Sequence, residues 1–295
     1  MRILVFGSSG QVGLCLRDEL LDFEHEVIFL SSSDVDITDK HETQSKIEFF
    51  DPDIVINAAA YTAVDKSEEE IGIAEAVNAT AVNTIAKVCK RVDAVLIHIS
   101  TDYVFDGEAN QPYSESSPTN PMGAYGRTKL LGECAAEASG CKFIIIRTSW
   151  LFSRYGNNFL KTMLRIGSSN ETIKVVSNEF GCPTYAPDLA RAIISTFETI
   201  KRSNFESGIY HFSGQLICSW YEFAEKIFSI ARIHDLKTPK FVLPIRSVDY
   251  PTLANRPVYS VLDNTKFITK FSNICSDLDL SISSTVSFVK DSSSK

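Results

Sequence analysis

The 295-residue sequence lacks long hydrophobic runs, since none approaches the roughly 20 apolar residues that a helix needs to cross a bilayer. It also lacks an excess of positive charge, because 37 acidic residues outnumber 29 basic ones and give a net charge of −8. Nucleic-acid binding requires clustered Lys and Arg, so this balance argues against nucleic acid as a partner. The first residues show no signal-peptide pattern, and we expect a cytoplasmic protein with no membrane partner.

Several chemical motifs are also missing. The seven cysteines include no C-x-x-C pair, and we expect them to be buried free thiols in a reducing compartment. No His/Cys cluster has metal-ligand spacing, so no metal site is expected. There is no G-x-S-x-G elbow, and the glycine-rich turn near the N-terminus lacks the Lys-Ser/Thr ending of a P-loop. These absences argue against a metalloprotein, a serine hydrolase and a nucleotide hydrolase.

What the sequence does contain, at its very start, is a strand, a glycine-rich turn and a helix. The apolar run Ile3–Phe6 leads into GSSGQVG (7–13) and then into a helical pattern. In dinucleotide-binding folds such a turn lets the backbone approach a pyrophosphate, which the helix N-terminus binds. The spacing is G-x-x-G-x-x-G, and a glycine turn without a ligand is the alternative.

Apolar runs then alternate with helical segments along the first half of the chain. Strands are predicted at 27–30, 53–57, 95–99 and 143–147, with helices from near Lys40, over 67–91 and over 125–138. This alternation predicts right-handed β-α-β units, and hence an α/β protein with a doubly wound parallel sheet of the Rossmann type.

Ligands of such sheets bind outside the carboxyl ends of the strands, where Gly7, 58–62, 100–103 and 148–150 are expected to meet. The small residues at 58–60 would let a cofactor lie against the backbone, and close strand–helix packing is the alternative. At the second strand end, Ser31 stands where NAD sites usually carry an acid, which tilts the expected cofactor towards NADPH, with NADH as the alternative.

Two acidic segments have simple structural interpretations. The acids in 34–39 either contact the adenosine or cap the helix that begins near Lys40. The charge run KSEEE (66–70) is expected to be a solvated first helical turn.

Beyond Trp150 the pattern changes. Helices are predicted at 157–166, 186–200 and 220–230, strands at 173–176 and 208–212, a loop region at 239–257 and a frayed tail at 291–295. We interpret residues 1–152, with late elements from about 185–213, as an NAD(P)-binding Rossmann domain. Residues 153–184 and 214–295 are interpreted as a smaller α+β substrate-binding lobe.

The candidate catalytic residues lie at the end of strand 95–99 and on the next helix. Tyr125 and Lys129 are four residues apart and share a helix face. A free tyrosine has a pKa of about 10, which a nearby ammonium lowers by roughly 1–3 pH units. Thr101 can hydrogen-bond the same substrate oxygen, so the set suits hydride transfer with Tyr125 as proton donor. His98 is interpreted as a core histidine.

Eight segments closely resemble dTDP-4-dehydrorhamnose reductases, which belong to the extended short-chain dehydrogenase/reductase superfamily. They are, in order, GSSGQVG, NAAAYTAVDKSE, STDYVFDG, YGRTKLLGE, RTSWLF, GNNFLKTML, EFGCPT and YPTLANRP. The resemblance covers roughly residues 1–270. The Q-V-G turn and TDYVFDG are specific to this subgroup, whereas Y-x-x-x-K marks only the superfamily.

The resemblance implies roles for individual residues. The catalytic triad would be Thr101, Tyr125 and Lys129, the last two also holding the nicotinamide ribose. The implied cofactor contacts are Gly10, Gln11, Val12, Asp36, Ile37, Ala60, Tyr61 and Thr62, beside the strand-end positions Gly7, Ser31 and Ala58. The implied substrate contacts are Thr101, Asp102, Tyr103 and Trp150 at the sugar and Arg256 at the nucleotide diphosphate.

The implied reaction is reduction of the C4 ketone of dTDP-4-dehydro-L-rhamnose to dTDP-L-rhamnose by NADPH or NADH. Some family members dimerise around a magnesium ion held partly by a glutamate just after Q-V-G. Leu14 and Cys15 stand there in this chain, so a metal-linked dimer is disfavoured and we expect a monomer or homodimer. Two alternatives stay open: a reductase of another nucleotide-linked 4-keto-deoxysugar, or a non-catalytic NADP-binding subunit like the regulatory β subunit of methionine adenosyltransferase.

Overall fold

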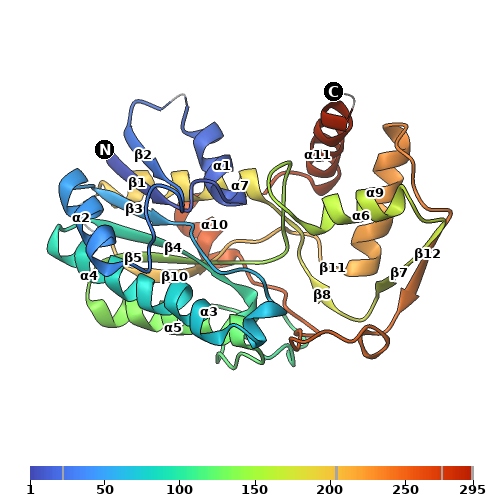
Figure 1. The fold of residues 1–295 in the computed structure, drawn as a ribbon, viewed down its shortest axis with the longest axis horizontal. Helices are drawn as coiled ribbons and strands as arrows, with labels where there is room; N and C mark the ends of the chain where they lie inside the picture. The colour runs from blue at the N-terminus through green and yellow to red at the C-terminus, as the bar shows by residue number, and fades with distance from the viewer. Residues whose placement is uncertain (22, 203–204, 274, 294–295) are drawn as a thin grey trace.

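The computed structural model describes residues 1–21, 23–202, 205–273 and 275–293. Its main sheet, counted over these residues, has six parallel strands in the order β10-β5-β4-β3-β1-β2 (Figure 1). The strands are β1 Arg2–Phe6, β2 Glu26–Leu30, β3 Ile54–Asn57, β4 Val95–Thr101, β5 Lys142–Thr148 and β10 Gly208–His211. The predicted doubly wound α/β fold is therefore confirmed.

The order of the strands reverses at β1, which pairs with β2 on one side and with β3 on the other. Phe6, the last residue of β1, lies opposite both Leu30 and Asn57, so the three strands end level. In open α/β sheets, ligands bind outside the carboxyl ends of the strands at such a reversal. The topology alone therefore places a ligand site beside the end of β1.

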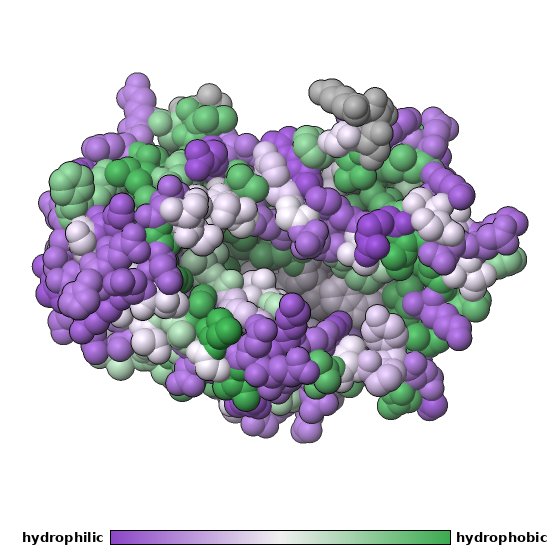
Figure 2. Space-filling view, viewed as in Figure 1, coloured by the Kyte–Doolittle hydropathy of each residue, from purple (hydrophilic) through white to green (hydrophobic). Residues whose placement is uncertain are grey.

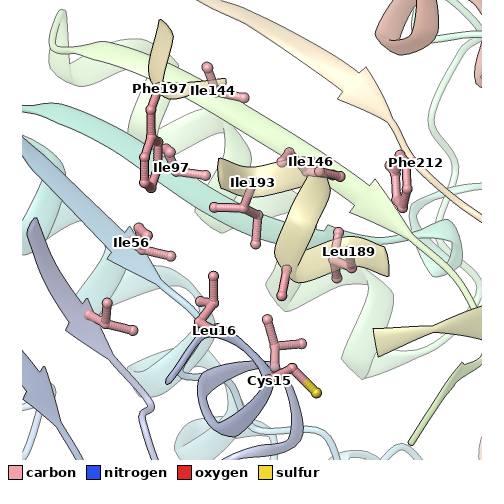
Figure 3. Packing of buried hydrophobic residues seen from close by; sticks show 14 of the residues in the cluster. Cys15, Leu16, Ile56, Ile97, Ile144, Ile146, Leu189, Ile193, Phe197 and Phe212 are labelled. Atoms are coloured by element: carbon pink, nitrogen blue, oxygen red, sulfur yellow. The ribbon is translucent and has the colours of Figure 1, made fainter. Parts of the chain in front are cut away.

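Helices cover both faces of the sheet because its strands carry apolar side chains on both. On one face, α1 Gln11–Glu19, α7 Ala186–Ser195 and α10 Thr265–Phe271 pack on the sheet, with Leu16 and Ile193 over Ile56 and Ile97 (Figure 3). The helices on the other face are α2 Lys40–Phe50, α4 Ala81–Arg91 and α5 Ala124–Ser139.

A third apolar cluster lies away from the sheet, on the right of Figure 1. There the helices α6 Phe159–Gly167, α9 Trp220–Ile233 and α11 Leu278–Ser293 pack with the parallel pair β7 Thr172–Val176 and β12 Phe241–Ile245. Two short pairs join this part to the sheet: β6 Leu151–Phe152 with β9 Thr184–Tyr185, and β8 Phe180–Gly181 with β11 Cys218–Ser219. The predicted boundaries between the Rossmann domain and the lobe stay a prediction.

The long helix predicted over 67–91 is wrong as one continuous element. It is divided into a 3₁₀ turn, Lys66–Glu68, the short helix α3 Ile71–Glu75, a π-helical segment, Ala76–Thr80, and α4. The widened turn contains Asn78, whose side-chain amide bonds the backbone of Tyr61. An interaction outside the helix therefore accompanies a break that the helical periodicity does not reveal.

The second half also differs from the predictions. The helix predicted over 186–200 is interrupted at Thr196, before α8 Phe197–Ile200. The predicted loop 239–257 contains β12, where Pro244 is tolerated at the edge of a two-stranded pair. The predicted frayed tail is wrong for 291–293, which belong to α11, while Ser294 and Lys295 lie outside the described residues.

No helix in the described part of the chain is long and apolar enough to cross a membrane. All seven cysteines are free thiols, and five of them are buried. Among the same residues, no group of three or more His, Cys, Asp and Glu could hold a metal ion.

Gly132 on α5 marks the closest approach of this helix to the π-helical segment. A Cβ at Gly132 would lie 2.1 Å from the carbonyl oxygen of Asn78, whereas one at Gly72 on α3 would meet nothing within 4 Å. We expect Gly132→Ala to lower the free energy of unfolding by about 1–3 kcal/mol and Gly72→Ala to leave it unchanged or raise it by up to about 1 kcal/mol. Urea titrations measure both, and equal effects would contradict the close approach.

Candidate active site

The turn after β1 has the shape of a phosphate cradle. Gly7 has a φ of +78°, and a Cβ there would lie 2.5 Å from the amide nitrogen of Ala59 after β3. A Cβ at Gly13 would lie 2.3 Å from the carbonyl oxygen of Gly7, so the turn sits tightly on the start of α1. Gly10 precedes α1 and no side chain caps this helix. The turn therefore leaves backbone N–H groups for an anion such as a pyrophosphate, and it fits a dinucleotide.

The loop after β2 is held by its own acids. Ser31 donates its N–H and its hydroxyl to Asp34, and Asp36 accepts from the N–H and hydroxyl of Thr38, which lowers the pKa of Asp36. Asp39 caps α2 by accepting from two backbone N–H groups, so the capping alternative holds for this acid. Ile37 packs into the apolar core.

The segment 58–62 follows β3 beside the glycine turn. Asn78 accepts from the N–H of Tyr61 at 2.9 Å and donates to its carbonyl oxygen at 3.1 Å and to the Thr128 hydroxyl at 3.2 Å. One amide thus ties this segment to α5. The Tyr61 hydroxyl donates to Glu70, which raises the pKa of Tyr61 to about 12.

The structure brings the three candidate catalytic residues together. Thr101 ends β4, and its hydroxyl hydrogen-bonds the Tyr125 hydroxyl and donates to an Asp102 carboxylate oxygen at 3.0 Å. The ring of Tyr125 meets that of Tyr103 edge to face at 5.6 Å. Lys129, one helical turn further along α5, donates from Nζ to the carbonyl oxygen of Ile99 at 2.6 Å.

The expectation that Lys129 lowers the pKa of Tyr125 is wrong for this structure. Burial raises the pKa of Tyr125 to about 12, opposed by its hydrogen bond with Thr101 and reinforced by the charge of Asp102. The amino group of Lys129 is turned to the backbone, and burial lowers its pKa to about 8 while Glu133 opposes that shift. At neutral pH Tyr125 is therefore protonated, as a proton donor must be.

His98 is fully buried, as expected of a core histidine. Its Nδ1 lies 3.2 Å from the side-chain nitrogen Nδ2 of Asn57, and its Nε2 lies 3.5 Å from Nζ of Lys129. Burial and the charge of Lys129 hold the pKa of His98 well below its usual range, so the ring stays neutral.

Polar atoms without partners lie at the ends of β4 and β5. Asp102 Oδ2 and Thr148 Oγ1 are buried and make no hydrogen bond within the described part of the chain. Burial raises the pKa of Asp102 to about 6. Buried polar atoms are normally satisfied, so this pair fits a ligand that carries hydroxyl groups.

A cavity of about 770 Å³ opens between α6, α9 and the 247–256 segment, and the molecule is hollowed between its two parts (Figure 2). Trp220 and Arg256 line this cavity. Trp150 stacks on Trp220 with ring centroids 3.4 Å apart and has a φ of +46°, a strained conformation for a side chain of this size. The charge of Arg256 acts on half-buried Tyr103, whose ring meets that of Tyr125.

Three acids of the run 65–70 make contacts within the site that the sequence did not predict, and the solvated first turn expected there is wrong. Glu68 accepts from the N–H of Ala124 at 2.6 Å, Glu70 accepts from the Tyr61 hydroxyl, and Asp65 accepts from Nη2 of Arg256 at 3.1 Å. The signal available was the motif NAAAYTAVDKSE, which carries Asp65 and Glu68.

A buried ion pair behind the site was missed as well. Arg147 on β5 donates to both carboxylate oxygens of Glu133 on α5, from Nε at 2.9 Å and from Nη2 at 2.6 Å. Ser100, next to Thr101, donates its hydroxyl to the same carboxylate. Glu133 thus joins α5, which carries the candidate catalytic residues, to β5 through Arg147 and to β4 through Ser100. Each partner is the second-to-last residue of its strand.

A glycine cradle at the reversal of a parallel sheet, with Thr101, Tyr125 and Lys129 assembled beside it, defines a short-chain dehydrogenase/reductase of the extended type. Comparison with known proteins identifies the family within this superfamily. A family model described as the RmlD substrate binding domain matches residues 1–288.

The dTDP-4-dehydrorhamnose reductase of Aggregatibacter actinomycetemcomitans is 42% identical over 273 residues, covering 92% of this chain and 93% of that protein. A crystal structure of a dTDP-4-dehydrorhamnose reductase from Clostridium acetobutylicum matches with a TM-score of 0.91 at 36% identity, covering 98% of this chain and 100% of that one. The Bacillus anthracis reductase in complex with NADP matches with a TM-score of 0.89 at 34% identity, covering 98% and 99%. The chain belongs to the dTDP-4-dehydrorhamnose reductase family.

The two residues that follow the Q-V-G turn, where the resemblance led us to look for a magnesium ligand, are Leu14 and Cys15. Cys15 is buried in the core between α1 and the sheet, and burial raises its pKa to about 12. Leu14 is half-buried. Neither side chain offers the carboxylate oxygen that magnesium prefers.

Replacing Glu133 by Leu should lower the free energy of unfolding by about 3–5 kcal/mol, because it leaves the Arg147 guanidinium buried without its counter-ion. The double variant Glu133→Leu/Arg147→Met should recover most of this loss. Glu48→Ala removes a half-exposed partner of Arg91 and should cost at most about 1 kcal/mol. Chemical denaturation compares the three, and a double variant no more stable than Glu133→Leu would contradict this account.

Proposed function

We propose that this protein reduces the C4 ketone of dTDP-4-dehydro-L-rhamnose to dTDP-L-rhamnose with a nicotinamide cofactor. The observation that carries the proposal is that Thr101, Tyr125 and Lys129 lie at the same strand-end edge of the sheet as the glycine cradle. Met122, three residues before Tyr125, lines the 770 Å³ cavity, which is large enough for a nucleotide. The relatives described above, which are dTDP-4-dehydrorhamnose reductases, support the choice of sugar.

The glycine cradle fits the cofactor, and we assign its binding to the strand ends and their loops. Gly7, Gly10, Gln11 and Val12 would hold the pyrophosphate, and Ser31, Asp36 and Ile37 the adenosine end. Ala58, Ala60, Tyr61 and Thr62 would line the opposite wall, with Tyr125 and Lys129 at the nicotinamide ribose. When bound, the reduced cofactor supplies the hydride to the carbonyl carbon.

We assign NADPH as the preferred form, with NADH as the alternative. Ser31 itself carries no carboxylate that would repel a 2′-phosphate, although the carboxylate of Asp34 accepts from its N–H and hydroxyl at the end of β2. The related Bacillus anthracis reductase, whose crystal structure is a complex with NADP, supports the same choice.

In the proposed mechanism Tyr125 donates its phenolic proton to the C4 oxygen as the carbonyl carbon accepts the hydride. Thr101, which hydrogen-bonds the Tyr125 hydroxyl, would hold the same oxygen. Lys129, when charged, would stabilise the phenolate that Tyr125 becomes. The high pKa of Tyr125 keeps the proton available but makes it a weak acid, so the charge on Lys129 is needed.

The substrate would be held at both of its ends. Asp102, with an unpartnered buried carboxylate oxygen, would accept from a sugar hydroxyl, and Tyr103 and Trp150 would border the ring. Arg256, at the cavity wall, would meet the diphosphate. We propose that the enzyme works in the cytoplasm as a monomer or homodimer.

Replacing Tyr125 by Phe should lower kcat by roughly 10²–10⁴-fold, because the proton donor is lost. Cofactor binding should change little, as the phenyl ring remains. NADPH oxidation with dTDP-4-dehydro-L-rhamnose measures turnover, and fluorescence titration measures binding. Tyr221→Phe is the matched control, since that hydroxyl bonds Glu225 on α9. Full activity of Tyr125→Phe would refute the donor role, and wild-type protein without turnover with NADPH or NADH would favour another keto-sugar or a non-catalytic subunit.

The rate should also depend on pH through Lys129. Its pKa is lowered to about 8, so its charge is present below that pH and is lost as the pH rises through it. We expect kcat to decline above about pH 8 and Lys129→Met to show a lower rate without that decline. Steady-state rates in buffers of constant ionic strength test this, and a wild-type rate that stays level well above the pKa would contradict it.

A further inference from the structure

The segment Asp65–Glu68 occupies a central place that the reaction proposed above does not explain. It begins three residues after Thr62, the last of the proposed cofactor contacts, and consists of Asp65 followed by the 3₁₀ turn Lys66–Glu68. Its two carboxylates reach different parts of the site. We call this segment the acidic turn.

Asp65 holds the loop that carries Arg256. One carboxylate oxygen accepts from the backbone N–H of Ala254 at 3.2 Å, and the other from Nη2 of Arg256 at 3.1 Å. Ala254 and Arg256 both line the 770 Å³ cavity. Asp65 thus fixes the backbone of this loop together with the direction of its cation.

The Arg256 guanidinium is only partly satisfied by Asp65. Its Nε is buried and has no hydrogen-bond partner among the described residues. A guanidinium binds phosphate oxygens through donors that lie in one plane. With Nη2 held by Asp65, that plane is set and Nε is left for a ligand.

Glu68 holds the N-terminal end of α5. Its Oε1 accepts from the N–H of Ala124, the first residue of α5, at 2.6 Å, and its second oxygen lies 3.9 Å from Arg127. Gly123 leaves room for this contact, because a Cβ there would lie 2.7 Å from Oε1. No side chain of α5 itself caps the helix, so Glu68 supplies both the acceptor and the negative charge that a helix N-terminus favours.

We propose that the acidic turn couples the cofactor site to the sugar-nucleotide site through two positioning residues. Asp65 orients Arg256 towards the diphosphate, and Glu68 fixes the end of α5 that carries Tyr125. Because the turn continues the cofactor-binding segment, contacts of a bound dinucleotide with 58–62 reach Arg256 through Asp65 and α5 through Glu68. This inference rests on the proposed function for the identity of the substrate.

The two carboxylates should affect different quantities. Asp65→Asn keeps an acceptor for the Ala254 N–H but removes the charge facing Arg256. It should weaken binding of dTDP and raise KM for the keto-sugar nucleotide about tenfold with kcat retained, since a hydrogen bond to a charged group is at stake. Glu68→Ala should lower kcat by about tenfold or more with KM little changed, because Tyr125 is displaced. Glu68→Gln, which retains the acceptor, should restore part of the loss.

Calorimetry with dTDP, in the presence and absence of NADP⁺, tests the coupling without turnover. Wild-type protein should bind dTDP more tightly when NADP⁺ is present, and Asp65→Asn should abolish that difference. Glu69→Gln, at the exposed residue directly after the acidic turn, is the matched control and should behave as wild type in every assay. Thermal unfolding of each variant shows whether it is folded. If Glu68→Ala does not fold, Glu68→Gln takes its place in the assays.

Three outcomes would overturn the inference. They are dTDP binding by Asp65→Asn that equals wild type, an identical affinity for dTDP with and without NADP⁺ in the wild type, and a Glu68→Ala variant that changes KM rather than kcat. Wild-type protein that fails to bind dTDP would instead refute the proposed substrate, and the assignment of Asp65 would fall with it.

Discussion

The buried ion pair between Glu133 and Arg147 is the interaction on which the geometry of the site depends. Both side chains are buried, so the charge of each must be compensated by the other. The two hydrogen bonds from Arg147 to Glu133 hold α5 in a fixed position relative to β5. Ser100 adds the same constraint from β4. Because Glu133 lies one helical turn beyond Lys129, fixing Glu133 fixes the candidate catalytic face of α5 against the end of β4, where Thr101 lies.

The N-terminal end of α5 is held by a different acid. Its first N–H is capped by Glu68, and its middle is pressed against the π-helical segment at Gly132. The helix is therefore fixed by a carboxylate at its N-terminal end and by an ion pair and a close backbone contact near its middle. The two acids, Glu68 and Glu133, come from different elements, so the position of Tyr125 depends on the fold as a whole rather than on α5 alone.

Local patterns in the sequence predict the sheet well, because fully buried parallel strands such as β3 are short apolar runs that few other structures tolerate. The glycine turn and the spacing of Tyr125 and Lys129 are equally local. The contacts of Asp65 and Glu68 are not, since their partners lie 191 and 56 residues away. A charge run on a turn usually faces solvent, and only the folded chain shows which acids face inwards.

Burial acts on Tyr125 and Lys129 in the same sense, favouring the uncharged form of each. A protonated tyrosine is what reduction of a ketone requires at the start, but the phenolate left afterwards is costly in the same desolvated place. The charge of Lys129, whose Nζ donates to the Ile99 carbonyl, can offset that cost as long as the amino group is protonated. Without bound ligands, burial therefore keeps the Tyr125 hydroxyl protonated at neutral pH.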